Sequence, residues 1–283
     1  MITLKALLKS GQVQLENYSD SAIEDCEILL SHTLNKNSAW LIAHSDSTLT
    51  SEQALAFQTY LRRRSAGEPV AYIVGQRAFW EHQFEVNANV LIPRSESEML
   101  VELAIQIVGS QTPTLQTQTI ADMGTGSGAI AISLAHELPQ SKVIAVDVLP
   151  EALAVARRNA KKIGVANVRF IESNWFSNLG GQDFNIIVAN PPYVALGDPH
   201  LVQGDLRFEP SGALCAGPNG INDIQKIINQ ATEHLQPNGN LMIEHGFEQG
   251  SKVRKLLSNA GFNNIVTHRD IASLERFSCG SLE

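Results

Sequence analysis

Residues Asn190-Pro191-Pro192-Tyr193 have the composition of a receptor for a planar NH2 group. They follow the apolar run 184–189, which predicts a buried strand. The two prolines fix two φ angles and remove two backbone donors, so nearby carbonyl oxygens are free to accept hydrogen bonds. The Asn side chain adds another acceptor, and the Tyr adds an aromatic face. Such a corner can hold an amide nitrogen with its lone pair toward a reaction partner, although an ordinary turn after a strand has the same sequence.

A glycine-rich loop follows the expected strand 119–123 and consists of Gly124, Thr125, Gly126, Ser127 and Gly128. Glycines allow a tight turn and a close approach of the backbone to a ligand, and the next helix presents free N–H groups. Asp147 ends the following expected strand, where its carboxylate can accept both hydroxyls of a ribose. The glycine-rich loop and Asp147 suit a nicotinamide dinucleotide as well as another adenosine-containing cofactor. An oxidoreductase therefore stays a possible function.

The order of these elements predicts the fold class of the larger part of the chain. Strands alternate with helices, at 119–123, 142–147, 168–172, 184–189 and 240–244. This alternation is typical of an α/β, doubly wound, mainly parallel sheet. Ligands bind beyond the carboxyl ends of such strands, where Gly124, Asp147, Asn174 and Asn190 all fall.

The first 75 residues are expected to be helical and to form a separate small domain. Ser21 with Glu24 and Thr50 with Gln53 have the spacing of capping boxes. The run Arg62-Arg63-Arg64 lies in a last helical turn, and we expect it to be solvated. The alternating segment 79–92 predicts a β-hairpin that turns at 87–89 and bridges the two domains. A Gln/Thr-rich stretch at 109–118 predicts a loop.

Composition narrows the class of protein. The formal net charge is −8 over 283 residues, which argues against a protein that grips nucleic acid through its phosphates. The sequence has neither a signal-peptide pattern nor a run of about eighteen apolar residues, so we expect no membrane association. The three cysteines are far apart and lack metal-ligand spacing, and we expect a cytoplasmic protein with reduced thiols and no metal.

The corner at 190–193 separates the two cofactor classes, because a nicotinamide enzyme has no evident need for an amide-holding turn. The combination resembles S-adenosylmethionine-dependent methyltransferases that act on exocyclic or amide nitrogen. Within them, nearly the whole chain resembles the HemK/PrmC family. The further segments that carry this resemblance are Phe79-Trp80, Leu91-Ile92-Pro93-Arg94, Asn174-Trp175-Phe176, 198–201, 204–210 and Glu244-His245-Gly246.

The resemblance implies an activity and a division of the chain. The activity is methylation, by S-adenosyl-L-methionine, of the glutamine side-chain amide in the Gly-Gly-Gln motif of class I peptide chain release factors. The division is a helical substrate-binding domain at 1–75, a β-hairpin bridge at 76–94 and a Rossmann-like class I S-adenosylmethionine-dependent methyltransferase domain at 95–283. Implied cofactor contacts are Gly124–Gly128, Asp147, Trp175 and Asn190, while the implied amide-holding residues are Asn190, Pro191, Pro192 and Tyr193. Of these, Asn190, Pro191 and Tyr193 are the implied catalytic residues.

The sequence departs from the family pattern at three places. Ser95-Glu96-Ser97 replaces the usual Pro-Asp/Glu-Thr, Asn174 replaces an Asp expected near the adenine amino group, and Ala272 replaces a Gly. Three other activities stay open: methylation of a ribosomal-protein glutamine, methylation of a DNA adenine amino group, and hydride transfer. A non-enzymatic cofactor-binding adaptor is a fourth alternative. The DNA enzyme would need a target-recognition region and a basic groove, which the sequence lacks.

The Arg94/Glu98 pair and His245 are further candidates for a role in the site. Arg94 and Glu98 are four residues apart at a helix start, where they are expected either to form an ion pair or to help close the site. His245 precedes a glycine and is expected to be a turn residue rather than a catalytic base.

Overall fold

The computed structural model describes residues 3–110 and 117–283, and the chain divides into two compact units. One unit comprises Met1–Gln76 with Val202–Phe208, and the other comprises Arg77–Leu201 with Glu209–Glu283. Residues 202–208, which the sequence placed inside 95–283, therefore group with the N-terminal helices. Of the expected loop at 109–118, residues 111–116 lie outside the described part of the chain.

The first unit is helical, as expected. Its helices are α1 (Leu4–Leu15), α2 (Ala22–Leu34), α3 (Ser38–Ala43), α4 (Ser51–Ser65) and α5 (Val70–Val74). The predicted capping box at the start of α4 is present: Thr50 and Gln53 each accept the other's backbone N–H. The predicted box at α2 is wrong, because the Ser21 hydroxyl donates to the Asp25 carboxylate and caps no backbone amide.

A buried ion pair joins α2 to α4. The Arg64 side chain, only 8% exposed, donates from Nε to Asp25 Oδ2 at 2.6 Å and from Nη1 to Asp205 Oδ1 at 2.7 Å. The prediction of a solvated arginine run is therefore wrong for Arg64, whereas Arg62 is exposed. The partners of Arg64 are 39 and 141 residues away in the sequence, so no local pattern shows them.

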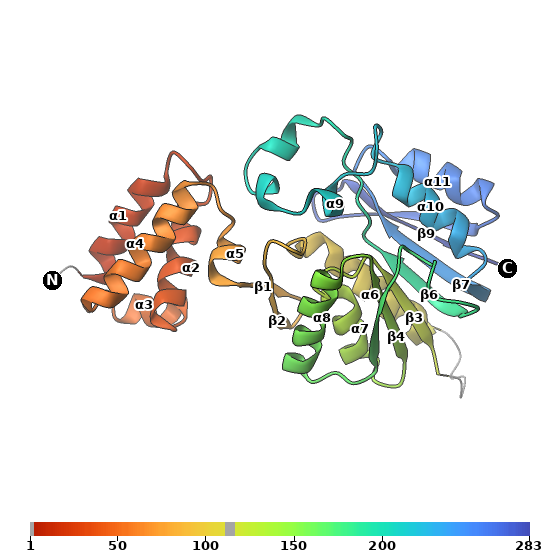
Figure 1. The fold of residues 1–283 in the computed structure, drawn as a ribbon, viewed down its shortest axis with the longest axis horizontal. Coiled ribbons are helices and arrows are strands. Elements are labelled where there is room, and N and C mark those ends of the chain that lie inside the picture. Colours follow the sequence, from red (N-terminus) through yellow and green to blue (C-terminus); the bar gives the residue numbers. More distant parts are fainter. Residues whose placement is uncertain (1–2, 111–116) are drawn as a thin grey trace. The chain divides into compact units, whose positions relative to one another are not determined.

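The second unit contains a two-stranded and a seven-stranded sheet among its described residues. The larger sheet has the order β5-β4-β3-β6-β7-β9-β8 (Figure 1). Its strands are β3 (Thr119–Met123), β4 (Lys142–Asp147), β5 (Val168–Glu172), β6 (Phe184–Ala189), β7 (Leu235–Glu244), β8 (Asn263–Arg269) and β9 (Glu275–Ser281). Strands β3 to β7 pair in parallel and β8 and β9 antiparallel, which confirms the predicted doubly wound α/β fold.

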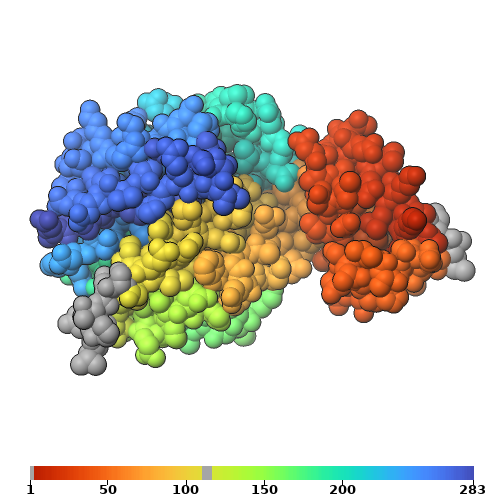
Figure 2. All heavy atoms as spheres, turned by 180° about the vertical axis from the view of Figure 1, so that it is seen from behind, coloured from red at the N-terminus to blue at the C-terminus, as the bar shows by residue number. Residues whose placement is uncertain are grey.

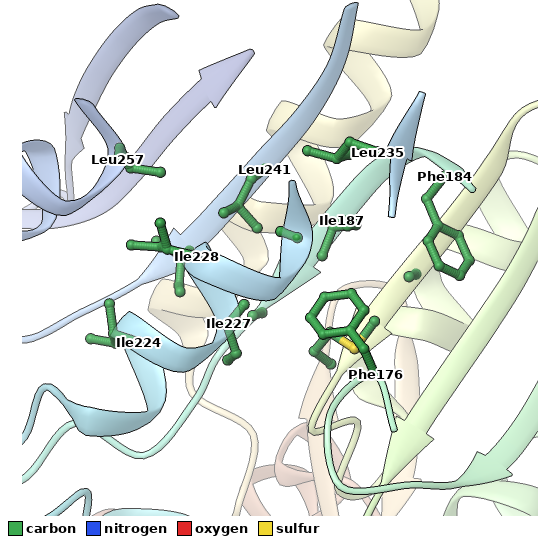
Figure 3. Close-up of a cluster of buried hydrophobic side chains, with 14 of the residues drawn as sticks. Phe176, Phe184, Ile187, Ile224, Ile227, Ile228, Leu235, Leu241 and Leu257 are labelled. Carbon is green, nitrogen blue, oxygen red and sulfur yellow. The ribbon is translucent and has the colours of Figure 1, made fainter. Parts of the chain in front are cut away.

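Helices cover both faces of this sheet. The helices of this unit are α6 (Glu98–Ser110), α7 (Ala129–Glu137), α8 (Pro150–Ile163), α9 (Ser211–Leu214), α10 (Asn222–Ala231) and α11 (Gly250–Asn259). Short 3-10 turns lie at Ser95–Ser97 and Pro199–Val202, and the 3-10 turn Leu206–Phe208 belongs to the first unit. Alternate strand residues point to opposite layers: Ile186 packs with α6 and α7, whereas Ile187 packs with α10 and α11. Figure 3 shows Ile187 in the second layer with Ile224, Ile227 and Ile228 of α10. Ligands of sheets covered on both faces bind beyond the carboxyl ends of the strands.

The smaller sheet is a hairpin within the predicted range 76–94, but its turn lies earlier than predicted. Strands β1 (Gln76–Phe79) and β2 (His82–Glu85) are joined by Trp80 and Glu81, so the predicted turn at 87–89 is wrong. Trp80 has φ 53°, a left-handed conformation that a Trp rarely adopts. Its backbone N–H donates to Glu98 and its indole N–H donates to Glu137, both at 2.8 Å. Contacts from α6 and α7 therefore hold a turn that the local sequence does not favour.

The two antiparallel strands near the end of the chain accommodate the departure at Ala272. The turn between β8 and β9 places its left-handed residue at Ser273, with φ 63°, rather than at Ala272. The Asp270 N–H bonds to the Leu274 carbonyl and closes the turn. A glycine at 272 is therefore not required for the pairing of the last strand.

We predict that Arg64→Ala lowers the free energy of unfolding by about 3–5 kcal/mol, because it removes the cationic partner of the buried Asp25 carboxylate and leaves only the Ser19 and Ser21 hydroxyls bonded to it. The measurement is urea denaturation followed by circular dichroism. Arg62→Ala removes an exposed arginine from the same helical turn and serves as the matched control, with a change of about 0.5 kcal/mol or less. Equal stability of the two variants would contradict the importance of the buried pair.

Candidate active site

The strand order of the large sheet reverses between β3 and β6. The chain proceeds from β3 to β4 and β5 on one side, whereas β6 and β7 lie on the other. In this register Met123 is opposite Ala189, so Gly124 and Asn190 leave neighbouring strands at the same level. Ligands of doubly wound sheets bind in the crevice at such a switch point.

A cavity of about 270 Å³ lies at this edge, within the second unit. Its lining includes six of the residues that the sequence singled out for the site, Gly124, Gly126, Asp147, Trp175, Asn190 and Pro192, together with Asn174. The rest of the wall comes from 89–91, 148–149, 152, 173, 212–213 and 223. The glycine loop, the strand-end acid and two residues of the corner at 190–193 therefore share one cavity.

Other predicted residues stand behind the cavity wall. Thr125 and Ser127 are buried, and the Thr125 hydroxyl donates to Asp122 at 2.7 Å. Gly128 has φ 84°, and a Cβ there would lie 2.6 Å from Cδ1 of Ile132. A glycine at 128 therefore permits the close start of α7, which is a packing role.

The Asp147 carboxylate is less free than predicted. Its Oδ2 accepts the Gly126 N–H at 2.8 Å, and its Oδ1 accepts the Leu149 N–H at 3.0 Å. Each carboxylate oxygen can accept a second hydrogen bond, so two hydroxyl donors can still bind. Burial raises the pKa of Asp147 against the lowering effect of these backbone donors. The two backbone bonds fix the orientation of the carboxylate at the cavity wall.

Trp175 supplies an aromatic wall. It has φ 54°, an uncommon conformation for a Trp, and such residues cluster at functional sites. A Cβ on Gly124 would lie 3.4 Å from its ring, and Gly124 itself has φ 77°. The neighbouring Asn174 side-chain oxygen accepts a hydrogen bond from Lys226 Nζ at 2.9 Å. Gly124 thus leaves the space between the loop and the indole open.

The corner at Asn190 is held by two residues to which the sequence gave no role. Asn190 Nδ2 donates to Ser97 Oγ at 2.9 Å, and this hydroxyl donates to Glu244 Oε2 at 2.6 Å. The Tyr193 hydroxyl donates to the other oxygen of Glu244 at 3.3 Å. Figure 2 shows the yellow segment that contains α6 next to the blue C-terminal strands. Ser97 and Glu244 are 147 residues apart, so their contact is a product of the fold.

Glu244 is a buried acid. Its side chain is only 2% exposed, and burial raises its pKa to about 7 against the hydrogen bonds from Ser97 and Tyr193. Burial likewise raises the pKa of the Tyr193 phenol. A second cavity beside them is lined by Arg94, Glu96, Tyr193, Glu244 and Arg276. Of the predicted corner residues, Tyr193 thus lines this neighbouring cavity, whereas Pro191 is buried and lines neither cavity.

The expected ion pair between Arg94 and Glu98 does not form. Arg94 instead pairs with Glu209, whose other oxygen accepts the Ile92 N–H at 3.0 Å, while Glu98 accepts the Trp80 N–H. His245 is fully buried, with one ring nitrogen bonded to the Gly246 carbonyl and the other to the Ser278 hydroxyl. These contacts agree with a structural role for His245.

Two absences hold for residues 3–110 and 117–283. No group of three or more His, Cys, Asp or Glu side chains there is arranged to hold a metal ion. No helix in the same ranges is both long and apolar enough to cross a membrane.

Known proteins resemble this chain in sequence and in structure. Residues 6–75 match the PrmC N-terminal domain family, and residues 116–272 match a methyltransferase domain family. Among solved structures, the hMettl16 catalytic domain has a TM-score of 0.56 at 14% identity and covers 82% of each chain. A Thermus thermophilus 16S rRNA methyltransferase with bound AdoMet and guanosine has a TM-score of 0.53 at 17% identity, over 74% of this chain and 50% of its own. At these identities the likeness shows the fold alone.

Relatives in sequence are much closer. A protein of Salmonella typhimurium named release factor glutamine methyltransferase is 44% identical over 262 residues, which cover 93% of each chain. A Vibrio cholerae protein of the same name is 42% identical over 281 residues, covering 99% of this chain and 96% of its own. With such identity over nearly its full length, the chain belongs to the release factor glutamine methyltransferase family.

Proposed function

We propose that this enzyme transfers a methyl group from S-adenosylmethionine to the glutamine side-chain amide in the Gly-Gly-Gln motif of class I release factors. The observation that carries the proposal is the position of Asn190, which lines the same cavity as Gly124 and Asp147. An amide acceptor and a nucleoside-type site therefore face one space. The name shared by the relatives supports this assignment.

The residues of the cavity fit the methyl donor. Asp147 has lone pairs left for the two ribose hydroxyls, and the Trp175 ring can stack on the adenine. Gly124 keeps the backbone beside this ring free of a side chain. Asn174 can still accept from the adenine amino group, in competition with Lys226. When bound, the donor supplies an electrophilic methyl group on a sulfonium sulfur.

The corner at Asn190 and Pro191 would act on the acceptor. An amide nitrogen is a weak nucleophile because its lone pair is delocalised into the carbonyl, so positioning must contribute much of the rate. Holding the nitrogen in line with the methyl group can supply up to ~7–11 kcal/mol. No N–H within the described residues donates to the Pro191 carbonyl, which leaves it free to accept from the substrate. Both acceptors bind more strongly as the nitrogen becomes positive in the transition state.

Tyr193 has a positioning task in this scheme. Its hydroxyl is tied to Glu244, which fixes the ring next to the two prolines. The ring can then restrain the plane of the glutamine amide without accepting its protons. The proton released after transfer can leave to water, since none of the described residues is required as a base.

Other activities fit the molecule less well. A DNA adenine methyltransferase needs a basic groove, whereas this chain has a net charge of −8. A nicotinamide oxidoreductase or a simple adaptor gives no use to the acceptors at 190–191. A ribosomal-protein glutamine would use the same chemistry, but the relatives are named for release factors. The proposal also places the enzyme in the cytoplasm, where release factors act.

We further propose that the helical unit helps to bind the protein substrate. Ile42 of α3 and Leu55 of α4 are large apolar side chains that are 77% and 65% exposed. In this proposal the two side chains contact the release factor. The first unit thereby binds the protein substrate, and the second unit holds the methyl-transfer site.

The decisive experiment for the proposed function is a labelled-methyl assay with a release factor, a ribosomal protein and duplex DNA as acceptors. We expect label in the release factor, with mass spectrometry locating the methyl group on the Gly-Gly-Gln glutamine. Label on another residue type, or on DNA alone, would overturn the proposal.

Asp147→Ala should weaken S-adenosylmethionine binding by roughly 1.5–3 kcal/mol, the scale of hydrogen bonds to a charged group. Isothermal titration measures the affinity, and circular dichroism checks folding. Glu172→Ala is the matched control, since Glu172 ends the neighbouring strand, is exposed and does not line the cavity. If both variants bound like the parent enzyme, Asp147 would have no place in the cofactor site.

The double substitution Ile42→Asp and Leu55→Asp should raise the KM for release factor several-fold while leaving cofactor affinity unchanged. Steady-state methylation at saturating cofactor measures the KM. Val266→Asp, which charges an exposed apolar side chain on β8, is the control. An unaltered KM in the double variant would assign the helical unit another purpose.

Asn190→Ala should lower kcat by on the order of a hundred- to a thousandfold, with a much smaller effect on cofactor affinity, because the lost contact is strongest in the transition state. Tyr193→Ala should act in the same direction more mildly. Single-turnover methyl transfer to a release factor measures both, and Asn229→Ala, at an exposed position of α10, is the control. Wild-type turnover in Asn190→Ala would refute the amide-holding role.

A further inference from the structure

Behind Asn190 lies a short chain of hydrogen bonds that ends on a buried acid. It runs from Asn190 Nδ2 to the Ser97 hydroxyl and from there to Glu244, over 2.9 and 2.6 Å. Ser97 is 3% exposed and Glu244 is 2% exposed, so water has little access to either side chain. Burial of an acid is costly unless it is hydrogen-bonded, and here Ser97 and Tyr193 each donate to one oxygen of Glu244.

The protons in this chain fix the direction of each bond. A serine hydroxyl has a single proton, and its 2.6 Å contact with Glu244 has the length of a charge-assisted bond to a carboxylate. Since that proton points at Glu244, the hydroxyl oxygen can only accept from Asn190. The NH2 end of the Asn190 amide must therefore face Ser97. The hydrogen-bond network thus sets the orientation of the Asn190 amide.

We propose that Ser97 and Glu244 are positioning residues that turn the Asn190 side-chain oxygen toward the substrate and thereby select a glutamine amide over a glutamate carboxylate. The inference rests on the proposed function, because it concerns the acceptor of that reaction. The Asn190 oxygen receives no hydrogen bond from the described residues, and the side chain lines the main cavity. Its free acceptor is thus available to a donor from outside.

The chemistry of the two side chains explains the selection. A glutamine amide offers two N–H donors to the Asn190 oxygen and the Pro191 carbonyl, whereas an ionised glutamate offers acceptors only. Facing acceptors without a proton between them repel, so glutamate is rejected by the orientation itself. If the Asn190 amide were flipped, its NH2 group would face the substrate and could donate a hydrogen bond to a carboxylate. Loss of the Ser97 hydroxyl removes the constraint that prevents this turn.

Ionisation of Glu244 sets the direction of the hydrogen bonds that run from Asn190 through Ser97 to Glu244. The groups that face its carboxyl are Ser97 and Tyr193 as donors, the arginines Arg94 and Arg276, and the acid Glu96. Its antiparallel partner on β9 is the apolar Phe277. Burial raises the pKa of Glu244 to about 7. Below that pH a protonated Glu244 can donate to Ser97, whose own proton then turns toward Asn190, and the orientation reverses.

The test compares affinities of the S-adenosylhomocysteine-loaded enzyme for a release factor with Gly-Gly-Gln and for the same factor with Gly-Gly-Glu. Contacts elsewhere cancel in the ratio of the two dissociation constants. We expect the wild type to favour the glutamine form, and Ser97→Ala to reduce this preference roughly tenfold, the scale of one hydrogen bond to a charged group. Ser97→Thr restores the hydroxyl and should keep the preference. Ser133→Ala deletes a buried hydroxyl elsewhere and serves as the control.

A pH profile of kcat/KM provides the second readout. In the wild type it should fall as the pH drops through about 7, because protonated Glu244 no longer orients Asn190. Glu244→Gln should lose this limb, and it remains informative if Ser97→Ala does not fold. An unchanged glutamine preference in Ser97→Ala, or the same acid limb in Glu244→Gln, would overturn the inference.

Failure of this inference is distinguishable from failure of the proposed function. A wild type that methylates Gly-Gly-Gln while Ser97→Ala keeps its full preference refutes only the positioning role. A wild type that leaves the release factor unmethylated refutes the proposed function, and the inference with it.

Discussion

The parallel pairing of β3 with β6 is the constraint on which the site depends. Neighbouring strands lie about 4.8 Å apart, and the register sets Met123 opposite Ala189. The glycine loop and the acceptor corner therefore emerge side by side, with no rearrangement of the chain needed to bring them together. Because helices cover both faces of the sheet, this edge is where two ligands can meet. Packing of Ile186 and Ile187 into opposite layers holds β6 in that register.

The strand pairing places Asn190, but it does not decide which end of its amide faces the cavity. That choice comes from Ser97 at the start of α6 and Glu244 at the end of β7. Burial raises the pKa of Glu244 to about 7 in the folded protein. The free energy of unfolding therefore falls as the pH rises from the carboxyl's lower pKa in the unfolded chain towards 7, because ionisation is easier in the unfolded chain. Strongly perturbed acids of this kind cluster at functional sites. The unfavourable burial is consistent with a group retained for orientation rather than for stability.

Features with a local cause could be predicted from the sequence. The capping box of Thr50 and Gln53 is confirmed, since both partners lie within one helical turn. The strands at 119–123, 142–147, 168–172 and 184–189 have the predicted bounds. The buried strand 184–189 is mostly apolar, whereas the edge strand 168–172 mixes apolar with charged residues. The features that sequence reasoning missed have distant causes. The hairpin turn at Trp80 is held from α6 and α7, Arg64 is buried by a partner 141 residues away, and Ser97 meets Glu244 only in the folded chain.

The central claim is that Asn190 and Pro191 hold the two hydrogens of a glutamine amide beside the methyl donor. A crystal structure with S-adenosylhomocysteine and a peptide that contains Gly-Gly-Gln tests it most directly. We expect the glutamine nitrogen within hydrogen-bond distance of both the Asn190 side-chain oxygen and the Pro191 carbonyl, facing the sulfur. A glutamine bound elsewhere, or an Asn190 amide whose NH2 group faces the substrate, would contradict it.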